Sequence, residues 1–412
     1  MPSSPTKSAL GHLRILDLTR VLAGPWCAQN FADLGADVIK IERPGTGDDT
    51  RAWGPPYLRD TDGNDTSEAA YYLAANRGKR SVTVDIATSE GQAIIRELVA
   101  HSDVVLENYK VGQLQKYGLD YAALKLIKPD LVYCSITGFG QTGPYAQRAG
   151  YDFIVQGMGG FMSITGERDA LPGGGPQKAG IAITDLMTGM YATVAVLAAL
   201  SHRDRTGEGQ HIDMALLDVQ VAMMANMGTN YLASDKAPER WGNAHPNIVP
   251  YQTFATADGH IIIAVGNDRQ FRNFVVAGGC AELADDARFA TNPMRVQHRD
   301  VLIPLLAVMV SGKSKQAWID RLEQAGVPCG PINNLQEVFE NPQVIARGLR
   351  VDLPHPSGAT TKLIGSPMRM SETPPDYATA PPLLGQHTDT VLKSLLGYSE
   401  SQIAALRGRD IL

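Results

Sequence analysis

The chain has 412 residues, of which 44% are hydrophobic and 19% are charged, and its formal net charge at pH 7 is −6. That length is too great for one compact core and favours two domains, while the composition is typical of a globular protein. The acidic balance gives no reason to expect nucleic acid or an anionic membrane as a partner.

The amino-terminal segment has no apolar stretch of the kind found in signal peptides, and no run elsewhere reaches membrane-spanning length without interruption. The four cysteines have neither metal-ligand spacing nor the spacing of a disulfide framework; they are Cys27, Cys134, Cys280 and Cys329. We therefore expect a cytoplasmic protein without a metal site.

Strand and helix patterns alternate through the first 150 residues. Short apolar runs predict strands at 13–18, 36–42, 81–86, 103–107 and 131–137, and a last strand of this domain is expected at 211–216. The alternation favours a parallel sheet covered on both faces, with ligands beyond the carboxyl ends of the strands. The segments expected around that crevice are 22–24, Arg43, 85–87, 108–110 and 137–140.

Asp185 stands where a glycine-studded segment gives way to an apolar one. Residues 186–200 are almost wholly apolar and small, which predicts a buried helix because no polar face is visible. Thr184 or Asp185 would begin that helix, where free N–H groups and the helix dipole favour an ionised carboxylate. Two interpretations remain open from spacing alone: an N-cap, or a carboxylate nucleophile at the rim of a buried pocket.

A second domain is expected from about Pro250, after a stretch that is first helical and then loop-like. Strands at 253–256 and 260–265 flank an Ala-Asp-Gly turn, and helices are expected at 269–276, 299–311 and 314–325. A proline-rich extended segment after residue 351 leads to a terminal helix at 388–396. The predicted division is 1–220 for the first part of a large domain, 221–249 for a linker, 250–340 for a small α+β domain, and 341–412 for a return strap that completes the large domain.

The sequence disfavours a dinucleotide oxidoreductase. The first strand leads into residues 19–25, which lack G-x-G-x-x-G, and Asp48 and Asp49 follow the glycines after the second strand, where they would repel a pyrophosphate. No Walker A loop, H-E-x-x-H pair or G-x-S-x-G elbow is present either.

Several motifs in a set order carry a family resemblance. They are LRILDLTRVLAGP (13–25), LGADVIKIERPGTGD (34–48), NRGKRSVTVDI (76–86), VLENYKVGQL (105–114), SITGFGQTGPY (135–145), AGVPCGPINNLQEVF (325–339) and LGQHT (384–388). Together they resemble the family III CoA-transferases, the group of the formyl-CoA:oxalate and carnitine CoA-transferases, over about residues 13–396. The α-methylacyl-CoA racemases are relatives of that group.

The resemblance implies a fold and an assembly. We expect an α/β protein with a Rossmann-like parallel sheet in a large domain built from amino- and carboxy-terminal parts, plus a smaller α+β domain. Two chains would be interlocked as a homodimer. A CoA thioester would be a substrate, with a carboxylic acid as the other partner, and no tightly bound cofactor is expected.

The resemblance also implies a chemistry for Asp185, which matches the family's nucleophile. That aspartate attacks the acyl-CoA to form an aspartyl anhydride, and then an aspartyl-CoA thioester from which the acceptor acid takes CoA. A carboxylate with an ordinary pKa of about 3.9 is ionised at neutral pH and needs no general base. The covalent route conserves the thioester energy, provided that water is kept out. The glycine-rich segment 157–160 could form a closely packed wall that excludes water from the site, or it could simply allow tight backbone packing.

The resemblance also implies a CoA site, because the family's CoA-binding positions can be matched to this sequence one residue at a time. Leu22 and Ala23 match the backbone at the pantetheine end, although Leu22 replaces a glutamine of the formyl-CoA enzymes. Arg43 matches an arginine near the nucleotide, or it is a solvated charge beside Glu42. Lys116 replaces an arginine, so a bidentate phosphate contact is not expected there. The other positions are Val84, Asp85, Ile86, Ala87, Asn108, Tyr109, Lys110, Arg148, Ala149, Gly150, Tyr151 and Asp152.

Tyr151 separates two enzymatic interpretations. The racemases carry a histidine here that works with the aspartate, because moving the α-proton between two faces needs two titratable groups. A tyrosine with a pKa of about 10 is a poor substitute. A racemase and a non-catalytic acyl-CoA-binding protein remain the alternatives to a transferase.

Residues 241–251, WGNAHPNIVPY, stand in place of the tetraglycine loop of the formyl-CoA enzymes. They resemble the branch that transfers CoA from succinyl-CoA to dicarboxylates such as glutarate. Gly242, Asn243 and His245 could bind a distal carboxylate through backbone and imidazole donors. His245 is equally well a loop histidine satisfied by its own backbone. We expect an acceptor of succinate to glutarate size.

Overall fold

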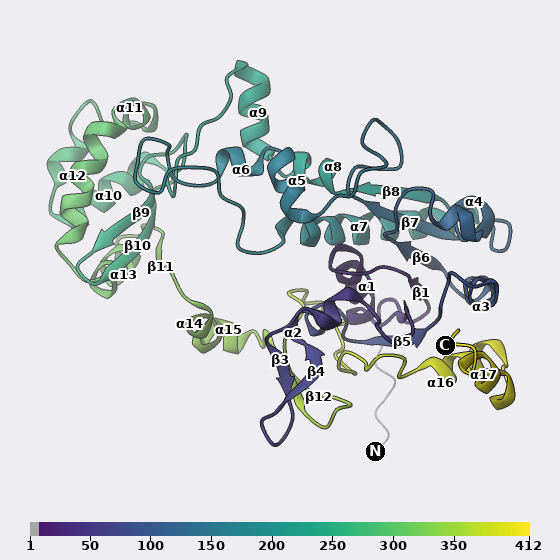
Figure 1. Cartoon of the computed structure of the whole chain (residues 1–412). Coiled ribbons are helices and arrows are strands. Elements are labelled where there is room, and N and C mark those ends of the chain that lie inside the picture. Colours follow the sequence, from purple (N-terminus) through teal and green to yellow (C-terminus); the bar gives the residue numbers. More distant parts are fainter. Residues whose placement is uncertain (1–7) are drawn as a thin grey trace. The chain divides into compact units, whose positions relative to one another are not determined.

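The computed structural model describes residues 8–412. Its largest sheet has six strands in the order β5-β2-β1-β6-β7-β8, and every neighbouring pair is parallel (Figure 1). The strands are β1 (Arg14–Asp17), β2 (Asp37–Glu42), β5 (Lys79–Thr83), β6 (Val104–Glu107), β7 (Val132–Thr137) and β8 (His211–Ala215). Each overlaps a strand that the sequence predicts, and the α/β class with a parallel sheet is confirmed.

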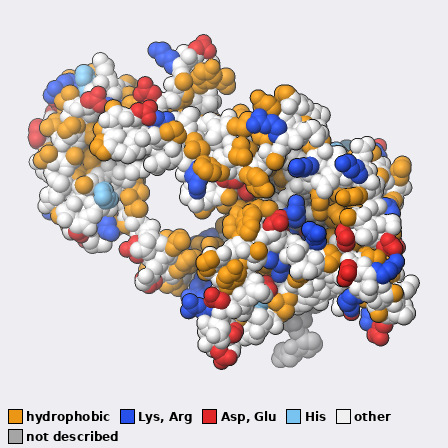
Figure 2. All heavy atoms as spheres, viewed as in Figure 1, with side chains coloured by type: hydrophobic (Ala, Val, Ile, Leu, Met, Phe, Trp, Pro, Cys, Tyr) orange, Lys and Arg blue, Asp and Glu red, His pale blue; other side chains and the backbone are white. Residues whose placement is uncertain are grey.

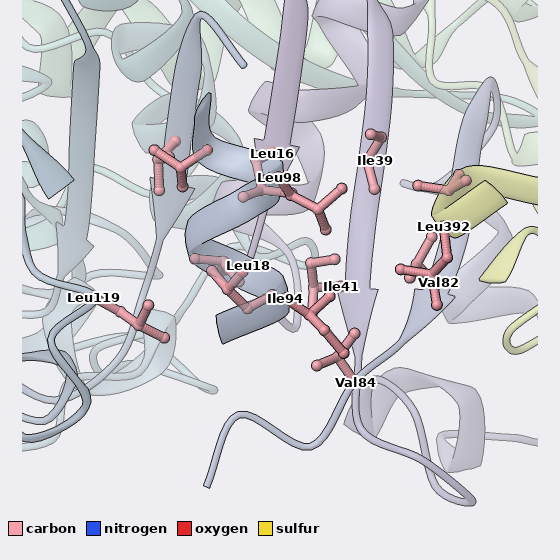
Figure 3. Close-up of a cluster of buried hydrophobic side chains, with 14 of the residues drawn as sticks. Leu16, Leu18, Ile39, Ile41, Val82, Val84, Ile94, Leu98, Leu119 and Leu392 are labelled. Carbon is pink, nitrogen blue, oxygen red and sulfur yellow. The ribbon is translucent and has the colours of Figure 1, made fainter. Parts of the chain in front are cut away.

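Alternating side chains of the strands build a hydrophobic layer on each face of this sheet. In β1, Ile15 belongs to one layer and Leu16 to the other. Figure 3 shows the layer of Leu16, in which strand residues meet Leu98 of α3 (Ser89–Ala100) and Leu392 of α16 (Thr388–Leu396). Strands that are buried on both faces need mostly apolar side chains, which explains the apolar runs of the sequence, and some of their buried charged residues form ion pairs.

The opposite face of the sheet is covered by α1 (Ala23–Asp33) and α7 (Ile183–Thr206). Of the helices in residues 8–412, α7 alone is long and apolar enough to cross a membrane by length and composition, although Asp185 interrupts its apolar run. Ala192 and Val196 of α7 are buried against the sheet, so core packing accounts for its composition. A Cβ at Gly189 would lie 2.6 Å from the Ala23 carbonyl oxygen, so a glycine is required at this contact between α1 and α7.

The carboxy-terminal strap is more structured than the sequence predicts. It contains the antiparallel hairpin β12 (Arg350–Pro354) and β13 (Thr360–Ile364), and it ends in α16 and a further helix, α17 (Glu400–Arg407). Leu353 of this hairpin packs with Tyr72 in a small separate core. The prolines were interpreted as extended chain, but Pro354 closes an edge strand, where a missing N–H costs nothing.

The chain folds into two compact units. Unit 1 runs to Gly160 and adds Ala179–Gly228 and Gln343–Leu412, whereas unit 2 comprises Phe161–Lys178 and Thr229–Pro342. Residues 161–178, which the sequence analysis assigned to the large domain, therefore belong to unit 2. Hydrogen bonds explain this, because the N–H of Gly242 donates to the Gly166 carbonyl at 3.1 Å and joins the two parts of the unit.

Unit 2 is built on an antiparallel sheet with the order β11-β10-β9, formed by β9 (Tyr251–Thr256), β10 (Gly259–Ala264) and β11 (Cys329–Pro331). Its core includes Phe271, Leu302 and Trp318 from α10 (Asp268–Gly278), α12 (Arg299–Ser311) and α13 (Lys315–Gln324). The hairpin and these helices lie where the sequence predicts them.

The remaining elements are short. The helices are α2 (Ala70–Leu73), α4 (Tyr121–Leu124), α5 (Asp152–Met158), α6 (Phe161–Ile164), α8 (Leu216–Ala222), α9 (Ala225–Ser234), α11 (Asn292–Gln297), α14 (Leu335–Glu340) and α15 (Pro342–Ala346), with 3-10 turns η1 (Asp49–Ala52), η2 (Leu114–Tyr117) and η3 (Ala281–Ala284). A hairpin of β3 (Tyr57–Arg59) and β4 (Asp65–Ala69) precedes β5. The sequence analysis did not predict this hairpin.

Candidate active site

The strand order reverses between β1 and β6, so the loops that follow these two strands diverge and leave a crevice. Asn108 joins the two loops: its Oδ1 accepts from the Arg20 N–H at 3.0 Å and its Nδ2 donates to the Arg20 carbonyl at 2.7 Å. A cavity of about 240 Å³ opens at this point. Among the predicted site residues it is lined by Leu22, Ala23, Asn108, Tyr109, Lys110, Arg148, Ala149, Gly150, Tyr151 and Asp185.

The backbone at the entrance of α1 is strained. Val21 has φ +72°, a conformation that β-branched residues rarely adopt. Its N–H donates to Asp48 Oδ1 at 3.2 Å, which holds the turn that directs Leu22 and Ala23 toward the cavity. α1 has no side-chain cap, so the first-turn N–H groups keep their capacity to bind a ligand oxygen. Neither Val21 nor Asp48 was among the predicted site residues, because local sequence does not mark a strained turn.

A second cavity, of about 320 Å³, adjoins the first, and both are lined by Arg20 and Tyr109. It contains the other predicted CoA positions, namely Arg43, Val84, Asp85, Ile86 and Ala87. Arg20 pairs with Asp49 at 3.0 Å, and its guanidinium lies 5.7 Å from the centre of the Tyr109 ring. Arg20 was missed by the sequence analysis, although it lies three positions after Asp17, the last residue of the first strand.

Three exposed cations line these cavities without a counter-charge. Arg43, Lys110 and Arg148 form no ion pair with any carboxylate of residues 8–412. They are therefore available to an anionic ligand. Lys116 is exposed on η2 and lines neither cavity, so the structure does not bring it to the other predicted residues.

Asp185 is the third residue of α7 and not its N-cap. The helix begins at Ile183, and the residue before it has no side-chain capping bond. Asp152 supplies the cap from α5, because its Oδ1 accepts from the N–H groups of Thr184 at 2.8 Å and Asp185 at 3.2 Å. The N-cap interpretation of Asp185 is therefore wrong, since a carboxylate from another helix takes that role. Asp152 itself does not line the first cavity.

The Asp185 carboxyl is chemically unusual. Burial raises its pKa to about 7, and the neighbouring Asp152 carboxylate contributes to the rise, while the positive end of the α7 dipole opposes it. The expectation of an ionised group at neutral pH rested on the ordinary carboxyl pKa, and burial raises the pKa of Asp185 well above that value. Tyr71 lies near both acids: its burial and the charges of Asp185 and Asp152 raise the pKa of its hydroxyl.

Hydrogen bonds hold this pair of acids in place. Asp152 Oδ2 accepts from Gln156 Nε2 at 2.5 Å, and Thr184 Oγ1 donates to Gln220 Oε1 at 2.6 Å. A Cβ at Gly159 would lie 2.3 Å from Gln220 Cγ, so tight packing explains this part of the glycine-rich segment. The position of Asp185 therefore depends on α5, α7 and α8 together.

A buried ionic network lies beneath the loops of the two cavities. Lys79 pairs with Asp17 at 3.0 Å and Lys40 pairs with Asp48 at 2.9 Å, with all four side chains inaccessible to solvent. Lys40 also donates to the carbonyl of Thr19 at 2.8 Å. The strand ends and the strained turn at Val21 are thus anchored by the same charges.

The predicted substrate residues lie in unit 2. Asn243 lines a cavity of about 370 Å³, whereas Gly242 and His245 do not. His245 Nδ1 accepts from the N–H of Asn247 at 3.0 Å, which is the loop-histidine arrangement, and Nε2 remains as the donor. Burial and the nearby Arg299 lower the pKa of the His245 ring, so it is neutral at pH 7.

No group of three His, Cys, Asp or Glu side chains within residues 8–412 is arranged to hold a metal ion. The four cysteines are unpaired. The chemistry available in the first cavity is therefore that of a buried carboxyl group, backbone N–H groups and exposed cations.

Comparison with known proteins gives consistent results. The model of a family described as CoA-transferase family III matches residues 10–388. A succinate–glutarate CoA-transferase from Agrobacterium fabrum is 54% identical over 389 residues, covering 94% of this chain and 96% of that protein. A human succinyl-CoA:glutarate CoA-transferase is 45% identical, covering 98% and 90%. The crystal structure of a CAIB/BAIF family protein from Brucella suis is 50% identical, with a TM-score of 0.83 over 94% of this chain and 99% of that one.

Proposed function

Because this chain belongs to CoA-transferase family III, we propose that it transfers CoA from succinyl-CoA to a small dicarboxylate of glutarate size, with Asp185 as the nucleophile. The observation that carries the proposal is the position of Asp185 in one cavity with the CoA loops after β1 and β6. The names of the Agrobacterium and human relatives support the choice of succinate and glutarate.

In the first half of the reaction, a carboxylate oxygen of Asp185 attacks the thioester carbonyl carbon of the donor. The new C–O bond forms as the C–S bond breaks, which yields an aspartyl anhydride and free CoA thiolate. The thiolate then attacks the Asp185 carbonyl carbon, so that succinate leaves and an aspartyl-CoA thioester remains.

In the second half, the acceptor carboxylate attacks the aspartyl thioester and releases CoA thiolate again. The thiolate attacks the acceptor's carbonyl carbon in the second anhydride, which forms the new acyl-CoA and restores the Asp185 carboxylate. Each step exchanges one activated acyl bond for another, so the thioester energy is kept and no other energy source is needed.

The surroundings of Asp185 suit this chemistry in two respects. A desolvated carboxylate is a stronger nucleophile than a hydrated one, and burial also limits the access of water to the anhydride. The uncapped first turn of α1, at Ala23, provides N–H groups that stabilise negative charge on the thioester oxygen during attack. Arg43, Lys110 and Arg148 are the partners proposed for the phosphates of CoA.

We also propose that two chains associate as an interlocked homodimer. Figure 2 shows hydrophobic side chains gathered on the exposed surface over α5 and α7. Met158, Met190, Tyr191, Val194 and Val221 are each at least 40% exposed in a single chain, and a second chain would remove them from water. Light scattering of the wild type and of Val194→Asp tests this, since a monomeric wild type would contradict it.

The direct test of the function is detection of the covalent intermediate. Wild-type protein incubated with succinyl-CoA should gain the mass of an acyl or CoA adduct, and hydroxylamine should convert Asp185 to a hydroxamate. Asp185→Ala should show neither product and should lose at least about 1000-fold in the rate of CoA transfer.

The same experiment separates the alternatives. A racemase would instead exchange the α-hydrogen of a branched acyl-CoA with deuterium from solvent, and a binding protein would give neither signal. Full transfer activity in Asp185→Ala would overturn the proposal.

A further inference from the structure

Two arginines in unit 2 share one aromatic ring. The guanidinium carbon of Arg168 lies 4.3 Å from the centre of the Trp241 ring system, and that of Arg299 lies 4.1 Å from it. Because both distances are measured to this one side chain, the two guanidinium carbons lie within roughly 8 Å of each other. Trp241 therefore holds two positive charges close together.

These two arginines have no counter-charge of their own. Among residues 8–412, neither comes within ion-pair distance of a carboxylate, whereas Arg240 in the same loop pairs with Asp169 and donates to the carbonyls of Ser163 and Glu167. Burial and the charge of Arg168 lower the pKa of Arg299, as expected for two cations that repel. An anion bound close to both guanidinium groups would offset this repulsion.

Two acids also line the cavity, but neither forms an ion pair with the arginines; the charge of Asp300 raises the pKa of Arg299, but burial and Arg168 lower it by more. Glu167 accepts the backbone N–H of Arg168 at 2.8 Å, and its carboxylate lies against Gly242, where an added Cβ would be 2.7 Å away. Asp300 is exposed and follows Arg299 in the chain. The two guanidinium groups are thus the cations of this wall that have no carboxylate partner among the described residues.

Backbone carbonyls hold Arg299 in place in the wall of this cavity. Arg299 is only 7% exposed, and its Nη2 donates to the carbonyl of Pro246 at 2.5 Å, which fixes the guanidinium against Trp241. Asn243 and Thr253 add polar groups to the wall, and the volume of about 370 Å³ is ample for a four- or five-carbon acid.

We propose that this cavity is a carboxylate-binding site for a small dicarboxylic acid, with Arg168 and Arg299 as the ligands of a carboxylate group. Guanidinium groups match carboxylates in a planar, two-bond geometry, and stacking on Trp241 orients them without cancelling their charge. The inference rests on the proposed function, because that function supplies the dicarboxylate.

The test measures glutarate binding by calorimetry and glutarate KM in the transferase assay, for the wild type and for Arg168→Gln and Arg299→Gln. Each substitution should weaken glutarate binding and raise its KM by about 10-fold or more. The KM for a monocarboxylate acceptor of similar length, such as valerate, should change less than twofold. Arg168→Gln is the more informative variant, because Arg299 also holds the loop at Pro246.

Arg288→Gln is the matched control. Arg288 is an exposed arginine of unit 2 that also lies beside an aromatic ring, 5.1 Å from Phe289, but it pairs with Asp286 and lines no part of the cavity. Glutarate binding in Arg168→Gln equal to that of Arg288→Gln would overturn the inference. A wild type that makes no covalent adduct would instead count against the proposed function, and glutarate calorimetry would still decide on the site.

Discussion

Two groups of buried carboxylates in unit 1 differ in the charges around them. In the network beneath the cavities, Asp17 and Asp48 face Lys79 and Lys40. Burial raises the pKa of each acid there, but the lysines outweigh it and leave both values below normal. Asp185 is partly buried, whereas Asp17 and Asp48 are inaccessible to solvent, yet its charged neighbour is another acid and its pKa rises to about 7.

The comparison shows that burial alone does not decide what a carboxylate does. A buried acid with a cation beside it is a fixed charge that fastens loops together. A buried acid beside a second acid remains a reactive nucleophile when it is ionised, because its charge is neither hydrated nor paired with a cation. Four predictions test this difference between the two kinds of carboxylate. The largest expected effect concerns a buried acid that is paired with a cation.

Removing a buried cation that is paired with a buried carboxylate should cost the most stability, and Arg51 with Glu42 is such a pair. Arg51 binds Glu42 through two hydrogen bonds of 2.9 and 2.8 Å, and it also donates to the carbonyl of Pro382 in the strap. Arg51→Met leaves Glu42 buried without its partner, so we expect a loss of about 3–5 kcal/mol in the free energy of unfolding, measured with urea. Arg407→Met removes an exposed arginine paired with Asp389 and should cost less than about 1 kcal/mol. Equal losses in the two variants would contradict the distinction.

Removing the unpaired acid, Asp185, should increase the free energy of unfolding instead of lowering it. The pKa of Asp185 is raised in the folded state, so the unfolded chain ionises first and stability falls as pH rises from about 4 to about 7. Asp185→Asn removes this penalty, and we expect a gain of roughly 2–4 kcal/mol at pH 8 with little change at pH 4. Thermal unfolding at both pH values checks this. Asp17→Asn is the contrasting variant, since it leaves Lys79 unpaired and should destabilise at pH 8.

The influence of Asp152 on Asp185 should appear in the pH dependence of catalysis. Adduct formation needs the ionised carboxylate, so its rate in the wild type should rise with pH around a midpoint near 7. Asp152→Asn keeps an oxygen for the helix cap but removes the neighbouring charge, and the midpoint should fall by about 0.5–1 unit. Single-turnover rates across pH 5–9 measure it. If the pH midpoint of Asp152→Asn equals that of the wild type, Asp152 does not contribute to the raised pKa of Asp185, and burial accounts for all of it.

The smallest expected effect is on the KM for succinyl-CoA, and it concerns Arg43, a cation outside the buried ionic network of Lys40, Asp48, Asp17 and Lys79. Arg43 is exposed and unpaired beside the second cavity, so Arg43→Gln should leave the unfolding temperature unchanged. Its KM for succinyl-CoA should rise about 3- to 10-fold, with the difference shrinking at high salt because the contact is between exposed charges. Arg59→Gln is a suitable control, because Arg59 is exposed and lines neither cavity. A similar KM for both variants would exclude Arg43 from the nucleotide site.

The strands of the large sheet could be predicted because each is buried on two faces. Such strands need continuous apolar runs, and these are visible without any knowledge of partners. The hairpin of β12 and β13 was missed for the opposite reason: it packs on Tyr72 and Leu73 from a distant part of the chain, and its own sequence is rich in prolines. Membership of residues 161–178 in unit 2 likewise depends on contacts with residues 240–242.

The sequence by itself determined the parallel sheet, the family and the identity of Asp185 as the candidate nucleophile, because apolar periodicity and ordered motifs are local properties of the chain. Tertiary structure decided the properties of that aspartate. Its cap comes from Asp152, 33 positions earlier in the chain, and its raised pKa comes from burial and from that same neighbour. Electrostatic environment is set by what surrounds a group in space, and no local pattern of residues records it.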